Sequence, residues 1–128
     1  MRSRFFAAAL GAIAAAAMCG CAKQPPSTIT LASGTKLNVV DEKSETYTDR
    51  HHVEKRVFDV EYESAQDFQD RTAVRNEMYE VFDFYKARID RGDYTKLNLT
   101  PVKRDLGGGW EGLPFYLERR PSGRWIVL

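Results

Sequence analysis

Apolar residues alternate with polar ones in the first part of the chain that can form a core. They lie in two short runs separated by an Ala-Ser-Gly-Thr segment, Ile29 and Leu31 before it and Leu37 and Val39 after it. A period of two is typical of strands with one buried face. The pattern predicts a small β-hairpin. Residues 41–50 are polar, and we expect them to form a loop.

A further strand is expected from about residue 53 to residue 63. Phe58, Val60 and Tyr62 would share its buried face, while the acidic residues between them would point to water. Strands with one buried face are therefore expected on both sides of the polar loop.

An amphipathic helix is expected to follow this strand. Ser64 is a suitable N-cap residue, with Asp67 in the first turn, and Gly92 would end the helix. The apolar residues recur at spacings of three and four, as one helix face requires; they are Val74, Met78, Val81, Tyr85 and Ile89, widened by Phe82. The charged residues between them, Glu77 included, are expected to face solvent.

Three more strand segments are expected after the helix. A strand should begin near Thr95, and Pro101 suggests that this strand ends there or runs along a sheet edge. Residues 105–112 are rich in glycine and predict a loop, and residues 115–118 and 125–128 predict a last hairpin. Strands on both sides of one long helix predict an α+β fold, a mainly antiparallel sheet with the helix packed on one face, in the approximate order β-β-β-α-β-β-β.

The first residues of the chain have the layout of a secretory signal. Arg2 and Arg4 precede an uncharged apolar run, residues 5–17, which is too short to span a bilayer as a helix. The segment that follows, Met18-Cys19-Gly20-Cys21, resembles the lipobox of bacterial lipoproteins. The resemblance implies that residues 1–20 are removed and that Cys21 carries the lipid. An uncleaved anchor, or a cleaved signal without lipid, would instead leave a free thiol in an oxidising compartment.

The segment after Cys21 predicts a short tether. Ala22 in the next position resembles lipoproteins sent to the outer membrane of a two-membrane cell, so we expect the protein to face the periplasm. Residues 21–27 comprise the lipidated cysteine and the tether, whose six residues 22–27 contain two adjacent prolines and would reach at most about 20 Å when extended. The remaining residues, 28–128, are expected to form a single domain near the membrane surface.

Charge narrows the class of partner. The chain has 19 lysine and arginine residues against 18 acidic ones, with the acids in excess over residues 41–90 and the bases in excess over residues 91–128. A nucleic-acid binder would be basic over most of its surface, so nucleic acid is not an expected partner. We expect the membrane, through the lipid, and an envelope protein as partners; the oligomeric state stays open.

His51 and His52 are the only histidines and the only candidates for a metal site. Adjacent residues of a strand point to opposite faces, so a chelating pair would need an irregular loop, where Asp49 and Glu54 could add oxygen ligands. A solvated polar loop is the simpler interpretation, and no cofactor is expected. No serine has the sequence context of an activated nucleophile, so no catalytic residue is assigned.

Trp110 and a group of cations are the candidate contact residues. Trp110 would either fold back over the sheet or be presented to a partner by a mobile loop. The cations would lie together if the last strands pair as expected, forming a basic rim toward lipid phosphates, lipopolysaccharide or an acidic partner; they are Lys103, Arg104, Arg119, Arg120 and Arg124.

These features favour a membrane-tethered, non-enzymatic binding or assembly module of the cell envelope. Two alternatives remain open at this point. One is a small envelope hydrolase or metal-dependent enzyme using His51, His52 and nearby acids, and the other is a structural subunit of an envelope or secretion complex.

Overall fold

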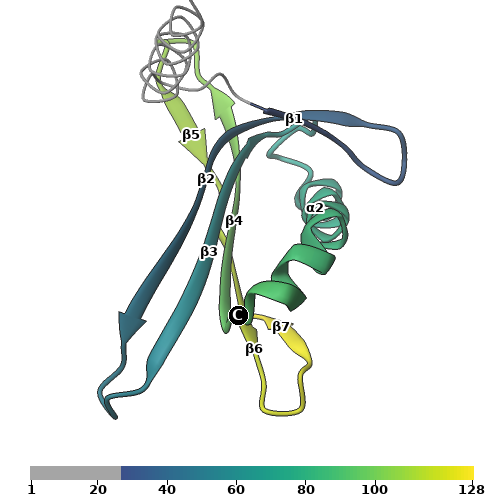
Figure 1. Cartoon of the computed structure of the whole chain (residues 1–128). Helices are drawn as coiled ribbons and strands as arrows, with labels where there is room; N and C mark the ends of the chain where they lie inside the picture. Colours follow the sequence, from purple (N-terminus) through teal and green to yellow (C-terminus); the bar gives the residue numbers. More distant parts are fainter. Residues whose placement is uncertain (1–26) are drawn as a thin grey trace, which may run out of the picture.

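The computed structural model describes residues 27–128, which form one seven-stranded sheet and one helix (Figure 1). The elements are β1 (Ser27–Thr30), β2 (Lys36–Thr48), β3 (Glu54–Glu63), α2 (Arg71–Gly92), β4 (Lys96–Arg104), β5 (Trp110–Gly112), β6 (Phe115–Arg119) and β7 (Trp125–Val127). Strands account for 46% and helix for 22% of the structure, and the predicted α+β class is confirmed.

The strand order in the sheet is β1-β2-β3-β4-β6-β7, with β5 also paired to β4. All pairs are antiparallel except β3 and β4, which are parallel and are joined by α2 as a crossover. Along one edge of β4, β5 is followed by β6, so that β4 pairs with one and then with the other. The expected antiparallel character therefore holds for the whole sheet apart from the crossover.

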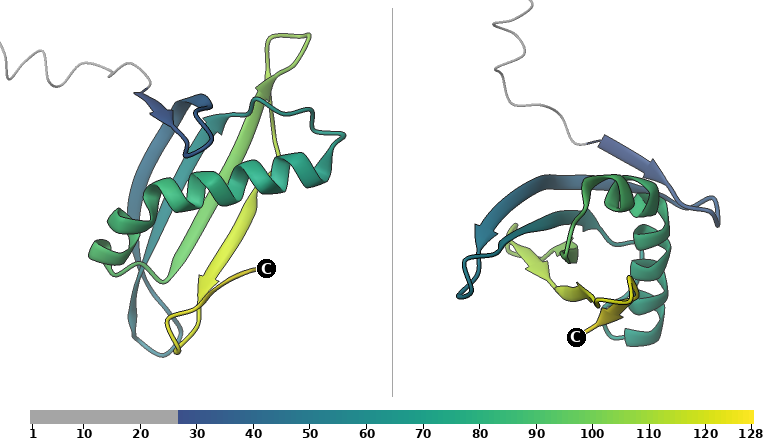
Figure 2. Two further views of the ribbon diagram at one scale, coloured as in Figure 1. Left: turned by 90° about the vertical axis from the view of Figure 1, so that its right-hand side faces the viewer. Right: turned by 60° about the horizontal axis from the view of Figure 1, so that its bottom comes forward.

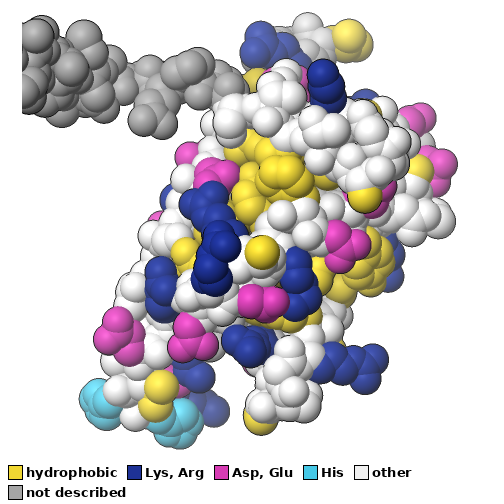
Figure 3. All heavy atoms as spheres, turned by 45° about the vertical axis from the view of Figure 1, so that its right-hand side comes forward, with side chains coloured by type: hydrophobic (Ala, Val, Ile, Leu, Met, Phe, Trp, Pro, Cys, Tyr) yellow, Lys and Arg dark blue, Asp and Glu magenta, His cyan; other side chains and the backbone are white. Residues whose placement is uncertain are grey.

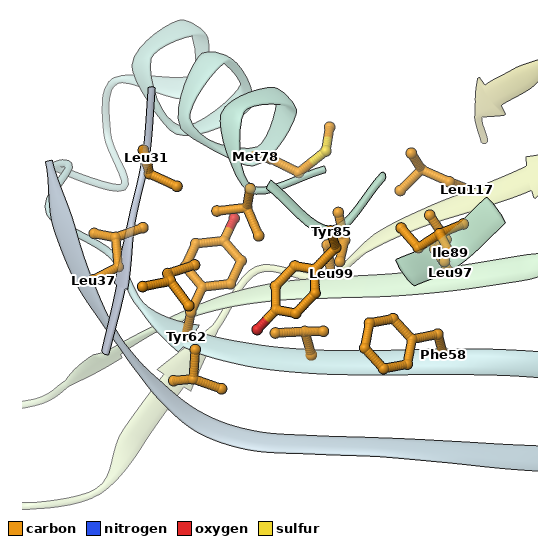
Figure 4. Close-up of a cluster of buried hydrophobic side chains, with 14 of the residues drawn as sticks. Leu31, Leu37, Phe58, Tyr62, Met78, Tyr85, Ile89, Leu97, Leu99 and Leu117 are labelled. Atoms are coloured by element: carbon orange, nitrogen blue, oxygen red, sulfur yellow. The ribbon is translucent and has the colours of Figure 1, made fainter. Parts of the chain in front are cut away.

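The core lies between α2 and the concave face of the sheet, as Figure 2 shows. Apolar residues from the first hairpin, the central strands and the helix meet there (Figure 4); those labelled are Leu31, Leu37, Phe58, Tyr62, Met78, Tyr85, Ile89, Leu97, Leu99 and Leu117. Each buried side chain of this size contributes roughly 1.5–3 kcal/mol. The expected helix stripe and the expected buried face of β3 are both confirmed. No helix within residues 27–128 combines the length and apolar character needed to cross a bilayer.

The polar loop expected over residues 41–50 is wrong for most of its length. β2 continues to Thr48 and pairs with β3 as far as Glu54, after a β-bulge between Val39 and Asp41. Backbone hydrogen bonds hold this extension together, and most of its side chains are exposed. A ribbon that is solvated on both faces needs no apolar alternation, which explains why the pattern did not reveal it.

The helix begins later than expected. Asp70, not Ser64, is the N-cap residue, and its carboxylate accepts a hydrogen bond of 3.1 Å from the amide of Ala73. Ser64 instead bonds to Glu77, which is only 2% exposed, so the expected solvation of Glu77 is also wrong. The helix ends at Gly92, as expected, because Asp93 adopts a left-handed conformation with a φ of 53°. A side chain at residue 92 would collide with the ring of Tyr94, so glycine is required there.

Pro101 lies inside a central strand, contrary to the expectation of an edge or an end. β4 runs on to Arg104 between β3 and the β5–β6 side. The carbonyl of Pro101 faces that side, where it accepts a hydrogen bond from Leu113, the residue at which β5 gives way to β6. The missing proline N–H therefore falls at a break in the ladder, where it interrupts no regular pairing.

Candidate functional site

Several of the sequence-based predictions concern residues outside those that the structure describes. These are the predictions of a signal peptide over residues 1–20, of lipid attachment at Cys21 and of a tether up to residue 26. The described residues begin at Ser27 in β1, so the predicted tether would join the domain there.

Ser27 lies at the end of the sheet from which the β4–β5 hairpin extends. It pairs with Val39, Val39 pairs with Tyr62, and Tyr62 pairs with Pro101. This row crosses the sheet next to Val102, where β5 joins β4. The β4–β5 hairpin extends from the same end, as the views in Figures 1 and 2 agree. We call this end, with Ser27 and the β4–β5 hairpin, the tether end.

The hairpin at the tether end closes with an ordered turn built on Asp105. Its carboxylate accepts hydrogen bonds from the amides of Gly107 at 2.9 Å and Gly109 at 2.8 Å, and its own amide donates to the carbonyl of Gly109. Gly108 has a φ of 83°, which favours glycine. Leu106, at the tip, is fully exposed. The turn thus presents an apolar side chain on a defined backbone.

Trp110 follows this turn and belongs to β5, so the expectation that it sits in a loop is wrong. It pairs with Arg104, whose guanidinium carbon lies 4.9 Å from the centroid of the indole ring. The side chain of Trp110 is 44% exposed and therefore does not plug the sheet. With Leu106 and the neighbouring Lys103, the hairpin combines apolar and cationic side chains, as residues at membrane interfaces do.

The cations expected to form one basic rim lie in two places. Lys103 and Arg104 are at the tether end, whereas Arg119 donates its amide to the carbonyl of Thr95 at the start of β4. The length of β4, about 25 Å at roughly 3.3 Å per residue, separates the two groups. Arg120 and Arg124 lie with Arg119, since they close the β6–β7 turn. The prediction of a single basic rim is therefore wrong. Antiparallel pairing of β6 with β4 places these three arginines at the end of the sheet opposite the tether end.

His51 and His52 lie in the turn between β2 and β3, at the lower end of the molecule in Figure 3. The Asp49 carboxylate accepts hydrogen bonds from the amides of His51 at 2.8 Å and Val53 at 3.0 Å. These bonds, the one from Val53 foremost, lower the pKa of Asp49. Asp49 thus organises the turn, and over residues 27–128 no three or more His, Cys, Asp or Glu side chains are grouped to hold a metal.

An open cationic groove of about 340 Å³ lies at the end opposite the tether end. His51 and Arg119, which were predicted to belong to different sites, both line this groove. Its lining residues are Tyr47, Asp49, Arg50, His51, Lys55, Thr95, Lys96, Glu118 and Arg119. Arg119 is partly neutralised, because Asp93 lies 3.7 Å from it. Positive charge still predominates in this groove, and an anionic group suits it better than a cation.

Two buried tyrosines have perturbed acidities. Burial, and secondly the charge of Glu77, raise the pKa of Tyr62; burial, and secondly a hydrogen bond to Glu42, raise the pKa of Tyr85. Both phenols lie in the core, 0% and 3% exposed, and neither lines the cationic groove. Their perturbed acidity is thus a property of the core.

Two features of the surface escaped the sequence reasoning. Leu106 was counted as part of a loop, and a second groove, between α2 and β7, brings Phe82, which the sequence places in the apolar stripe, together with Arg75, Tyr79 and the last strand. Comparison with protein families, curated proteins and solved structures finds no match for this chain. Any functional proposal therefore rests on the residues and their geometry.

Proposed function

We propose that this protein is a membrane-tethered, non-enzymatic binding or assembly module of the bacterial cell envelope. It is anchored by lipid on Cys21 and faces the periplasm, from the outer membrane in a two-membrane cell. One observation supports the proposal beyond the lipobox: Ser27, where the proposed tether would join the domain, lies at the end of the sheet that also bears Leu106 and Trp110.

A short tether restricts which surface meets the membrane. Residues 22–27 would reach about 20 Å at most, so Ser27 and its neighbours remain close to the headgroups. The β4–β5 hairpin extends from the same end of the sheet as Ser27, and its side chains suit a position near the headgroups. Leu106 and Trp110 can enter the boundary between headgroups and acyl chains, while Lys103 and Arg104 face lipid phosphates.

The energetics are consistent with a weak secondary contact. A cation near an anionic surface contributes about 1 kcal/mol, and burying a large apolar side chain contributes roughly 1.5–3 kcal/mol. The ordered Asp105 turn lowers the entropic cost of presenting Leu106. The hairpin would thus orient a domain that the lipid already holds, leaving the opposite end free for a partner.

This orientation revises the role of the arginines at the β6–β7 turn. The sequence-based hypothesis placed Arg119, Arg120 and Arg124 against the membrane, but the strand register puts them at the end away from Ser27. In the revised proposal they face the periplasm and can meet an acidic partner.

Binding to vesicles tests the proposal. Soluble residues 22–128 are mixed with anionic phosphatidylglycerol vesicles at low and at physiological salt, while tryptophan fluorescence is recorded. We expect weak binding that decreases with salt, and a blue shift that Trp110→Phe removes, since Trp125 supplies the remaining emission.

Two charge reversals provide a matched comparison. Arg104→Glu at the tether end should weaken vesicle binding several-fold, and Arg120→Glu at the far end should leave it unchanged. If Arg120→Glu has the larger effect, or if the domain ignores anionic vesicles at low salt, the proposed orientation is wrong.

A further inference from the structure

The outer edge of β7 is unpaired within residues 27–128, since β7 ends the strand order of the sheet. Leu128 donates its amide to Tyr116, and Arg124 accepts from Arg120, so even-numbered residues of this strand bond toward β6. The amides and carbonyls of Trp125 and Val127 therefore point away from the sheet. Such an edge can accept one more strand.

A groove of about 340 Å³ runs beside this edge, between β7 and α2. Its lining comes from both elements and consists of Arg75, Tyr79, Phe82, Leu117, Arg124, Trp125, Ile126 and Val127. Phe82 meets Trp125 edge to face, with ring centroids 6.1 Å apart. An added strand would direct every second side chain into this groove, toward the apolar floor that Phe82 and Trp125 form.

Polar groups at the groove lack partners among the described residues. The indole Nε1 of Trp125 is buried without a hydrogen-bond acceptor. Arg75 and Arg124 are both exposed, and neither is in an ion pair within the described part of the chain. Arg124 precedes β7, while Arg75 lies about two helical turns before Phe82, so the cations flank the apolar floor on two sides.

We propose that the β7 edge and the adjoining α2 groove bind an extended segment of a partner protein as an additional strand. The segment has a short apolar stretch flanked by acidic residues. Its backbone pairs with Trp125 and Val127, its apolar side chains cover Phe82, and its acids meet Arg75 and Arg124. This deepens the proposed function, on which it rests for the partner's compartment, by naming where a tethered module holds its partner.

A second copy of this chain is a poorer occupant on grounds of charge. A second copy would bring its own Arg75 and Arg124 to the shared edge, and the lining of the groove contains no acidic residue to pair with them. Like charges brought together destabilise such a pairing, whereas an acidic segment neutralises them.

The test uses the full chain in non-ionic detergent micelles and a fluorescent peptide with a Val-Thr-Val centre flanked by glutamates. The same peptide with lysine in place of glutamate is its control. We expect saturable binding of the glutamate peptide only. Arg124→Glu should weaken this binding roughly tenfold, as loss of one charge-assisted contact and gain of repulsion would, whereas Arg104→Glu at the tether end should not affect it.

The backbone contact has its own matched pair of variants. Val127→Pro removes an amide that points away from β6, so it should abolish peptide binding, while Val127→Ala loses similar packing but keeps the amide. Thermal melting shows whether the proline variant folds. If it does not, the effect of Arg124→Glu on peptide binding decides whether the proposal holds. Equal binding of both peptides, binding unaffected by Val127→Pro in a folded protein, or no binding of either peptide would overturn the proposal.

Two further outcomes distinguish this inference from dimer formation through β7 and from the membrane proposal. A dimer that Val127→Pro dissociates would show that a second copy occupies the edge, and the acidic-partner proposal would then be wrong. Vesicle binding through the tether end is measured without peptide, so a failure of peptide binding alone leaves the membrane proposal standing, and the reverse also holds.

Discussion

The hydroxyl of Ser64, just beyond the end of β3, donates a hydrogen bond of 2.7 Å to the carboxylate of Glu77 on α2. The other oxygen of the same carboxylate accepts from the amide of Ala65 at 3.0 Å. A buried acid thus ties the segment between β3 and α2 to the helix. This link explains why residues 64–70 form a bonded loop and the helix starts only after Asp70.

Replacing Glu77 with alanine should cost about 1–3 kcal/mol of unfolding free energy, because the Ser64 hydroxyl and Ala65 amide lose their acceptor. Asp83→Ala, an exposed acid on the same helix, is the matched control and should change stability by about 0.5 kcal/mol or less. Urea denaturation measures both. Equal effects of the two substitutions would show that the Glu77 link contributes nothing of its own.

The two buried tyrosines should respond differently to loss of their hydroxyls. Tyr85 donates a hydrogen bond of 2.9 Å to Glu42, so Tyr85→Phe should destabilise the protein by about 1 kcal/mol. The hydroxyl of Tyr62 is buried with no partner among residues 27–128, so Tyr62→Phe should be neutral or stabilising. Thermal denaturation at neutral pH separates the two, and a larger loss for Tyr62→Phe would contradict the assignment.

The same tyrosines predict a loss of stability in alkali. Their folded pKa values are raised above the ordinary value near 10, so the folded state keeps protons that the unfolded state releases. Their contribution is fully present below about pH 10 and is lost as the pH rises further. The decline above pH 10 should be shallower in Tyr62→Phe than in the parent. Identical profiles would show that Tyr62 does not carry this effect.

Deleting residues 125–128 should leave little folded protein. Trp125 and Val127 pack against the core cluster, and β7 forms an antiparallel pair with β6. The loss amounts to a few partly buried apolar side chains at roughly 1.5–3 kcal/mol each when fully buried, which is comparable with a domain's whole stability. Circular dichroism against temperature measures this, and a truncated chain with an unchanged melting temperature would disprove the role given to β7.

The local pattern of apolar and polar residues was enough to predict the elements that have one buried and one exposed face. The alternation around Phe58 and the stripe through Met78 identify β3 and α2, because each has one face in the core. β2 beyond the bulge could not be found this way, since most of its own side chains are exposed and its strand conformation depends on backbone pairing with β3. The prediction that Pro101 lies at an edge or an end failed for a related reason. A proline fits inside β4 only because it lies where β5 gives way to β6, and pairing across the sheet decides that position.

The contact residues were predictable by type but not by place. Trp110 and the cations stood out in the sequence, yet the strand register decides which of them share an end with Ser27. An excess of bases after residue 90 cannot reveal that Arg104 ends β4 while Arg119, on β6, lies beside the start of β4. Leu106 gave no signal, because full exposure of a leucine depends on the Asp105 turn that holds it.

The proposed function depends most on lipid at Cys21, and metabolic labelling with an alkyne-bearing palmitate in a bacterial host tests this attachment directly. The full chain and its Cys19→Ser variant should incorporate label and fractionate with membranes. Cys21→Ser should lose the label and accumulate as unprocessed precursor or soluble protein. Label retained by Cys21→Ser but lost from Cys19→Ser would contradict the assignment, and label in none of the three would contradict the tethered module itself.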